Sequence, residues 1–248
     1  MKHTGNTILV TGGGSGIGQA LAHRWHDAGN HVIITGRREA VLQEAIAGRA
    51  RMAAYVLDVT DDGAVDAFVQ LVLAQHPRLN ILVNNAGIYS PERVTMRRDL
   101  AAAGRMIATN LLGPIRMTNA LIDHLGAQPD AALINVSSGL AFVPYPAAPT
   151  YSATKAAMHS YTAALRPLLA GSVEVIEIVP PQVQTELAPG QSLDPNSMPL
   201  AAFADEVMAL LHAADTPAEV CVEGVRYFRE AEANGQFGTA LQMLAQYS

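Results

Sequence analysis

Residues 7–18 read TILVTGGGSGIG, and this stretch decides the fold. The apolar run Thr7–Thr11 reads as a strand, glycines follow it directly, and a helical pattern begins at Ile17. A strand, a glycine-rich turn and a helix in this order are typical of a dinucleotide-binding turn, in which the pyrophosphate lies on the positive end of the helix. A glycine-rich turn that binds nothing is the alternative.

Three glycines of this turn have an expected role. Gly12 is expected to permit the tight turn, Gly16 to let backbone amides approach the pyrophosphate, and Gly18 to let the helix pack closely on the strand. The other predicted cofactor contacts in the turn are Gly14, Ser15 and Ile17.

Short apolar runs alternate with helical patterns through the rest of the chain. The predicted strands are 7–11, 31–35, 53–57, 80–83, 131–136, 173–179 and 220–222. The predicted helices are 17–28, 38–47, 61–75, 96–125, 150–169 and 202–214. Continuous apolar strands between helices predict an α/β fold, a doubly wound Rossmann domain whose seven-stranded parallel sheet is flanked by helices. No linker divides residues 1–248, so one domain is expected, with a substrate loop at about 182–200 and a broken helical tail after Gly224.

Composition limits the partners and the location. The chain has 248 residues, 50% of them hydrophobic and 15% charged, and such a sparsely charged surface favours a homodimer or homotetramer. The net charge of −6 and the lack of a basic run argue against nucleic acid. No apolar run reaches membrane-spanning length, and no signal peptide is recognisable, so a cytoplasmic protein is expected. The histidines show no metal-binding spacing, and we expect no metal site.

The end of the second strand indicates which dinucleotide binds. An acidic residue usually holds a free 2′-hydroxyl at this position, but the chain reads Gly36-Arg37-Arg38. Guanidinium groups suit a 2′-phosphate, which favours NADP(H) over NAD(H), although two arginines at a helix start can also be a solvated face. Asp58, at the end of the third strand, could accept a hydrogen bond from the adenine amino group or could cap the helix that follows.

Ser138, Tyr151 and Lys155 form the candidate catalytic set. Tyr151 and Lys155 are four residues apart, so on a helix both side chains lie on one face. An ammonium next to a phenol favours the ionised phenol, so Lys155 is expected to lower the pKa of Tyr151. Ser138 follows the apolar run ALINV, at the strand end where open α/β sheets bind ligands. A surface Tyr-Lys pair with a serine in a turn is the alternative.

The chain resembles the short-chain dehydrogenase/reductase family over essentially its whole length. The residues that carry the resemblance are TGGGSGIG at 11–18, Asp58, NNAG at 84–87, Asn110, Ser138 and YSATK at 151–155. It extends to a subgroup related to the oxidoreductase found with lipoteichoic-acid D-alanylation genes, through SSGLAFVP, IEIVPPQVQTEL and MPLAAFADEVMALL.

The resemblance implies further site residues. It makes Ser138, Tyr151 and Lys155 catalytic, with Asn110 completing a tetrad by anchoring a water that links Lys155 to solvent. It also implies cofactor contacts from Val59, Asn85, Ala86, Gly87, Pro181, Val183 and Thr185, besides Tyr151 and Lys155 themselves.

Two positions depart from the family pattern. Pro180-Pro181 stands where most members have Pro-Gly, so the loop geometry near the nicotinamide is expected to differ, since proline fixes φ and lacks an N–H. Pro167 is expected to kink or end its helix, three turns beyond Lys155.

The sequence favours an NADP(H)-dependent oxidoreductase that transfers a hydride between nicotinamide and a carbonyl or secondary alcohol of a small to medium apolar substrate, with Tyr151 as general acid/base. The expected substrate walls are Tyr89, Leu140, Phe142, Val143, Tyr145 and the loop 182–200. A non-catalytic NADP-binding sensor is the alternative from another class, and a sugar-nucleotide epimerase or dehydratase is disfavoured by the short chain.

Overall fold

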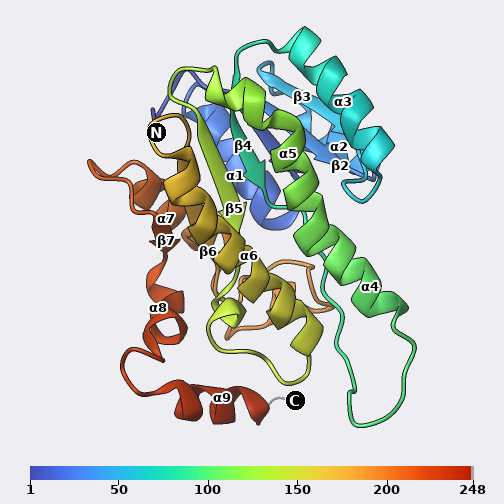
Figure 1. The fold of residues 1–248 in the computed structure, drawn as a ribbon, viewed down its shortest axis with the longest axis vertical. Coiled ribbons are helices and arrows are strands. Elements are labelled where there is room, and N and C mark those ends of the chain that lie inside the picture. The colour runs from blue at the N-terminus through green and yellow to red at the C-terminus, as the bar shows by residue number, and fades with distance from the viewer. Residues whose placement is uncertain (247–248) are drawn as a thin grey trace.

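A parallel sheet organises residues 1–246, the part of the chain that the computed structural model describes (Figure 1). Its seven strands lie in the order β3-β2-β1-β4-β5-β6-β7. Their bounds are β1 Thr7–Thr11, β2 His31–Gly36, β3 Met52–Val56, β4 Leu79–Asn84, β5 Ala132–Val136, β6 Glu174–Val179 and β7 Glu219–Cys221. The order reverses between β1 and β4, and the carboxyl ends at such a point are where open α/β sheets bind ligands.

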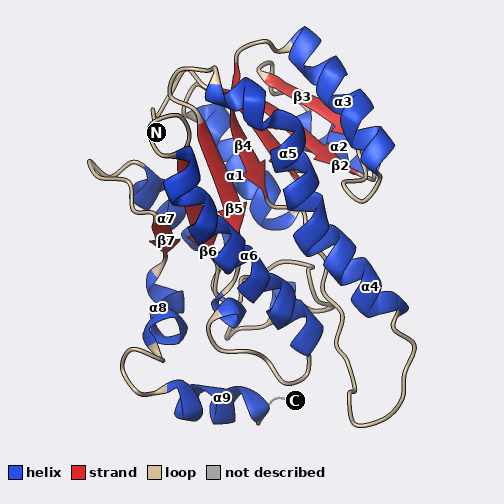
Figure 2. Ribbon diagram, viewed as in Figure 1, coloured by secondary structure: helices blue, strands red, loops and turns tan. Residues whose placement is uncertain are grey.

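Helices cover both faces of the sheet (Figure 2). Their bounds are α1 Gly16–Asp27, α2 Glu39–Ile46, α3 Asp62–Gln75, α4 Ala101–Ile107, α5 Gly113–Gly126, α6 Pro149–Leu169, α7 Leu200–Leu211, α8 Glu223–Glu230 and α9 Phe237–Ala245. Helices α1, α2 and α7 pack on one face, and α3, α5 and α6 pack on the other. In Figure 1, α5 and α6 cross in front of the sheet while α1 lies behind it.

Each face of the sheet has its own hydrophobic core. Alternate residues of one strand enter different cores, so that Ile8 and Val10 contact the α1 side while Leu9 contacts the α3 and α5 side. Trp25 of α1 is fully buried in the first core. This two-sided burial explains why the strands read as continuous apolar runs, and the predicted fold class is confirmed.

The long helix predicted over 96–125 starts later and is interrupted. It begins at Ala101, where the side chain of Asp99 accepts a hydrogen bond of 2.9 Å from the Ala101 amide. A π-helical segment, η1 Ala108–Leu112, separates α4 from α5. Pro167 lies in the last turn of α6, which continues for two residues beyond the proline and ends at Leu169.

The C-terminal tail forms two short helices, as the broken helical pattern predicts. Val225 and Phe228 of α8 lie against Gly139, in the turn that follows Ser138. Among the helices of residues 1–246, none combines the length and apolar character needed to cross a bilayer.

Candidate active site

The glycine-rich turn has the shape that its sequence predicts. Gly12 has φ of 66° and Gly16 has φ of 55°, a left-handed conformation that favours glycine. A Cβ on Gly18 would lie 2.5 Å from the Gly12 carbonyl oxygen and 2.3 Å from Asn85 Nδ2. The amino end of α1 therefore lies directly on the turn, as a pyrophosphate site requires.

Asn85 ties the end of β4 to this turn. Its Nδ2 donates to the carbonyl oxygens of Thr11 at 2.9 Å and Gly12 at 3.2 Å. The Thr11 hydroxyl accepts from the amides of Asn85 and Ala86, at 3.0 and 3.1 Å. The side chain of Asn85 thus holds the turn in place, and residues 85–87 lie beside the turn and line the same cavity.

Arg37 and Arg38 follow β2 at the rim of the same cavity, together with Asp58 after β3. Asp58 Oδ1 accepts from the amide and the hydroxyl of Thr60, at 2.9 and 2.7 Å. Burial acts to raise the pKa of Asp58, but these hydrogen bonds and the charge of Arg37 lower it below its ordinary value. Asp61, rather than Asp58, caps α3, since Asp61 Oδ1 accepts from the Ala64 amide.

Ser138, Tyr151 and Lys155 meet at the carboxyl end of β5. Ser138 caps the short 3-10 turn η2 Gly139–Ala141, and its hydroxyl accepts from the Leu140 amide at 3.1 Å. Tyr151 and Lys155 lie one turn apart on α6, with Lys155 Nζ 5.7 Å from the centre of the Tyr151 ring. Lys155 Nζ donates to the Val136 carbonyl oxygen at 2.9 Å, which fixes the lysine at the strand end.

Burial controls the pKa of both α6 side chains, which are 6% and 5% exposed for Tyr151 and Lys155. Burial raises the pKa of Tyr151, while its hydrogen bond with Ser138 acts in the opposite direction. Burial also lowers the pKa of Lys155 to about 8. The expected lowering of the Tyr151 pKa by Lys155 is therefore wrong for this structure, because loss of solvation is the larger effect. A neutral phenol at neutral pH can donate a proton.

Asn110 lies behind the cavity in the π-helical segment η1, a type of irregularity that is frequent at functional sites. Its Oδ1 accepts from the Ile88 amide at 2.8 Å, and its Nδ2 donates to the Ile88 carbonyl at 2.9 Å and to the Thr154 hydroxyl at 3.3 Å. Asn110 therefore fixes the chain that leaves β4 against α6.

A single cavity of about 810 Å³ joins these parts. The catalytic candidates Ser138, Tyr151 and Lys155 line it. So do the cofactor candidates Gly12, Gly14, Ser15, Gly16, Ile17, Arg37, Arg38, Asp58, Val59, Asn85, Ala86, Gly87, Pro181, Val183 and Thr185. Gly18 and Asn110 do not line it and act through packing and hydrogen bonds.

The substrate end of the cavity differs from the expectation. Tyr89 lines it, and its ring lies edge-on to Tyr151 with centroids 5.3 Å apart. Phe142 instead lies between His159 and Arg229, each 4.7 Å from its ring centroid, and Val143 is buried in a cluster with α8 and α9 residues. Leu140 and Tyr145 pack beside Tyr151 in a small apolar cluster rather than on the cavity wall.

Several further residues line the cavity that the sequence does not single out individually. They are Val41, Leu42, Ile88, Thr109, Glu186, Leu187, Gln191, Ser192 and Leu200. Five of these come from the loop 182–200, which is pinned by a bridge between Val183 and Met198. The loop was expected to border the site, but which of its side chains face inward depends on that bridge.

A family model described as short chain dehydrogenase matches residues 6–196. The chain belongs to the short-chain dehydrogenase family. The predicted family resemblance is therefore confirmed, and the glycine turn and the Ser138, Tyr151 and Lys155 cluster both fall within the matched residues.

Two oxidoreductases are similar to this chain in sequence, and a solved short chain dehydrogenase is similar to it in shape. The uncharacterized oxidoreductase DltE of Bacillus subtilis is 44% identical over 191 residues, 75% of each chain. Sulfoacetaldehyde reductase 2 of Chromohalobacter salexigens is 37% identical over 186 residues, 72% of this chain and 73% of the relative. A short chain dehydrogenase from Burkholderia cenocepacia J2315, crystallised in complex with NADP, is 25% identical with a TM-score of 0.82, covering 97% of this chain and 99% of that one. These similarities support an oxidoreductase with a nicotinamide cofactor and a small-molecule substrate.

Proposed function

We propose that this chain is an NADP(H)-dependent reductase or dehydrogenase that interconverts a carbonyl and a secondary alcohol on a small to medium apolar substrate. The observation that carries the proposal is one cavity lined both by the glycine-rich turn and by Ser138, Tyr151 and Lys155. A cofactor-binding sensor has no need for a buried proton donor beside the cofactor site.

Each residue of the site has a separate role in the proposed reaction. A nicotinamide dinucleotide bound at the glycine turn supplies or accepts the hydride. In the reducing direction, the Tyr151 hydroxyl donates its proton to the developing alkoxide oxygen, and the Ser138 hydroxyl donates a hydrogen bond to the same oxygen. Lys155 places a positive charge beside them and would hold the ribose hydroxyls. Asn110 supports this group by fixing Ile88 against α6.

Arg37 and Arg38 support NADP(H) as the cofactor. Both line the cavity directly after β2, and Gly36 stands where an acidic residue would accept hydrogen bonds from a free 2′-hydroxyl. Guanidinium groups form charge-assisted, bidentate hydrogen bonds to phosphate. We therefore propose that they bind the 2′-phosphate.

The substrate is proposed to be apolar because apolar side chains line the cavity. Ile88 and Tyr89 pack with Tyr151, and Pro181, Leu187 and Leu200 also line the cavity. In such a cavity, the few polar groups orient the carbonyl oxygen of the substrate, and the apolar walls bind the remainder of the substrate by hydrophobic contact.

A homodimer or homotetramer is part of the proposal. Ile107 and Leu112, on consecutive turns of the α4–η1 segment, are 42% and 40% exposed, and Leu168 of α6 is 77% exposed. Burial of such side chains between subunits would remove apolar surface from water. Light scattering of the purified protein tests it, and a monomer at micromolar concentration would contradict it. Cytoplasmic location stays a prediction from the sequence.

The decisive experiment follows NADPH and NADH oxidation by the purified protein over a panel of aldehydes, ketones and diketones. Tyr151→Phe removes the proton donor and is expected to lower kcat by at least about a hundredfold. Tyr161→Phe is a matched control, because it removes a hydroxyl from the same helix at a residue that does not line the cavity.

The outcomes separate the alternatives. Turnover that collapses in Tyr151→Phe but not in Tyr161→Phe supports the proposal. Equal turnover in wild type and Tyr151→Phe would overturn the role of Tyr151. No turnover of any compound, with a melting temperature that still rises with NADPH, would favour a cofactor-binding sensor.

A further inference from the structure

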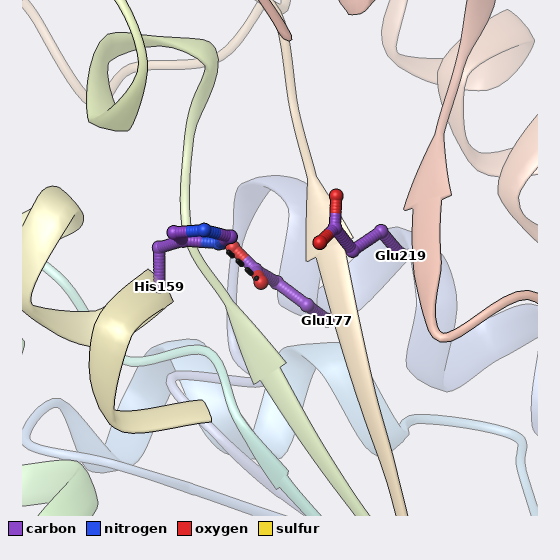
Figure 3. Close-up of side chains that lie close together, drawn as sticks. All are labelled: His159, Glu177 and Glu219. Atoms are coloured by element: carbon purple, nitrogen blue, oxygen red, sulfur yellow. Dashed lines mark hydrogen bonds and ion pairs between the residues drawn. The ribbon is translucent and has the colours of Figure 1, made fainter. Parts of the chain in front are cut away.

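A buried charged cluster lies under α6, one helical turn beyond the catalytic lysine. His159 Nδ1 and Glu177 Oε2 are 2.9 Å apart, and Glu219 of β7 points toward them from the other side (Figure 3). The side chain of Glu177 is fully buried, whereas those of His159 and Glu219 are 28% and 22% exposed. The sequence VEVIEIV gives no sign that a charged residue of β6 is enclosed.

The three ligand-type atoms lie within 4.8 Å of one another, which is close enough for a metal ion. The surrounding charges argue against that reading. Arg229 Nε lies 2.6 Å from Glu219 Oε2, and Arg166 Nη2 lies 3.6 Å from Glu177 Oε2. Two guanidinium groups already lie beside the two carboxylates, so a dication here would add two further positive charges next to these cations.

The cluster continues the side of α6 that carries Lys155. Lys155, His159 and Arg166 are spaced by four and seven residues, and all three face the sheet. On the sheet, Glu177 pairs in register with Asn135, the residue before Val136, whose carbonyl accepts from Lys155 Nζ. Glu177 therefore lies on the strand next to the anchor of the lysine.

The carboxylate of Glu177 is only partly compensated. Its Oε1 is buried and has no hydrogen-bond partner among residues 1–246. Its Oε2 contacts His159, which carries a charge only when protonated, and Arg166 at the longer distance of 3.6 Å. In a buried site with little water, a residual negative charge acts on nearby cations more strongly than it would at the surface.

We propose that Glu177 is a positioning residue for Lys155, whose buried carboxylate keeps the lysine in the charged ammonium form that the active site uses. The proposal rests on the catalytic role given to Lys155 above. The pKa of Lys155 agrees with this, because burial lowers it to about 8 while the charge of Glu177 acts in the raising direction. Without that carboxylate, burial would deprotonate the lysine closer to neutral pH.

Other ionisable groups share this environment and must be held constant in a test. Those around Lys155 and Glu177 are Tyr151, His159 and Arg166 on α6, Glu219 and Cys221 on β7, and Arg229 on α8.

The chain offers a direct measurement, because Lys2 and Lys155 are its two lysines. Protein labelled with 13C at lysine Cε gives one NMR signal for each, and Lys155→Arg assigns them. Lys2 is 64% exposed and serves as the internal reference. In Glu177→Gln, the titration midpoint of Lys155 is expected to fall by about one pH unit while that of Lys2 stays constant. The alkaline limb of kcat against pH should move in the same direction.

Matched variants separate charge from packing. Glu219→Gln breaks the pairs with Arg166 and Arg229 but keeps the Glu177 carboxylate, so it should lower stability and leave the Lys155 midpoint within a few tenths of a pH unit of wild type. Glu177→Asp keeps the charge and should largely restore the midpoint. An unchanged Lys155 midpoint in folded Glu177→Gln would overturn the proposal, even if that variant were less stable.

If Glu177→Gln does not fold, Arg166→Met decides instead. Removal of this guanidinium leaves Glu177 less compensated, so the Lys155 midpoint should rise, and a constant or lower midpoint would overturn the proposal.

The NMR titration needs no turnover. A protein without reductase activity would therefore contradict the proposed function while the titration still decided whether Glu177 acts on Lys155.

Discussion

Replacement of Glu92 by alanine is expected to destabilise the amino end of α6, close to Tyr151. Helix α6 begins after Ala148, which has no side chain able to cap it. Glu92, from the segment between β4 and α4, takes that role. Its Oε2 accepts from the Thr150 amide at 2.8 Å and its Oε1 from the Thr150 hydroxyl at 2.9 Å. Arg98 Nη2 donates to Oε1 at 2.6 Å, and the Glu92 side chain is 4% exposed.

The expected cost follows from these contacts. Loss of a helix cap costs about 1 kcal/mol, and a partly buried carboxylate at a helix amino end contributes up to about 2 kcal/mol. These contributions overlap, so we expect Glu92→Ala to lower the free energy of unfolding by about 2–3 kcal/mol. For a chain of this length, that corresponds to a fall in Tm of about 4–12 °C. Glu92→Gln keeps an acceptor oxygen and loses the charge, so about 1 kcal/mol is expected.

Thermal unfolding followed by calorimetry, at a fixed protein concentration, measures these differences. Glu44→Ala is the control, since Glu44 is an exposed carboxylate on α2. The KM for the carbonyl substrate should also rise in Glu92→Ala, because the segment that Glu92 anchors carries Tyr89. If Glu92→Ala and Glu44→Ala unfolded at the same temperature, the assignment of Glu92 as the cap of α6 would be refuted.

Two further predictions concern the cofactor rim and the turn after Ser138. In the double variant Arg37→Ala, Arg38→Ala, the ratio of kcat/KM for NADPH to that for NADH should fall at least about tenfold, because the 2′-phosphate loses its cations; an unchanged ratio, measured by steady-state kinetics, would contradict this. Gly139→Ala places a Cβ 2.7 Å from Val225 Cγ2 and should cost about 1–3 kcal/mol and lower kcat. Denaturant titration measures the loss, adding Val225→Ala should recover part of it, and wild-type stability of the single variant would refute the proposed clash.

The parts of the fold that were predictable are those set by local pattern. Strand β1 at Thr7–Thr11 and helix α1 are visible because a buried parallel strand is continuously apolar and a glycine turn follows it. Predicted strand ends agree with the structure to within about one residue for the same reason. The single-domain organisation of residues 1–248 remains a prediction.

Features that depend on distant contacts were not predictable. The start of the long helix at Ala101 depends on the Asp99 side chain, and the π-helical segment at Asn110 has no periodicity of its own. The pKa of Tyr151 depends on how completely the fold encloses it, which the spacing to Lys155 does not reveal. Glu177 is the clearest case. Its partners His159 and Arg166 lie on α6, and only the folded chain brings this helix next to the strand.

The interior position of β1 in the sheet has a consequence for how the chain folds during its synthesis. Strand β1 precedes the other six strands along the chain and lies inside the sheet, so strands synthesised after it add outward, first to β3 on one side and then to β7 on the other. Val225 and Phe228, which pack against the turn after Ser138, are synthesised after all seven strands. A nascent chain can therefore fold its cofactor turn well before Ser138 has its native support. A chain terminated early, before α8, would keep the glycine-rich turn but would lack the side chains that support the turn after Ser138.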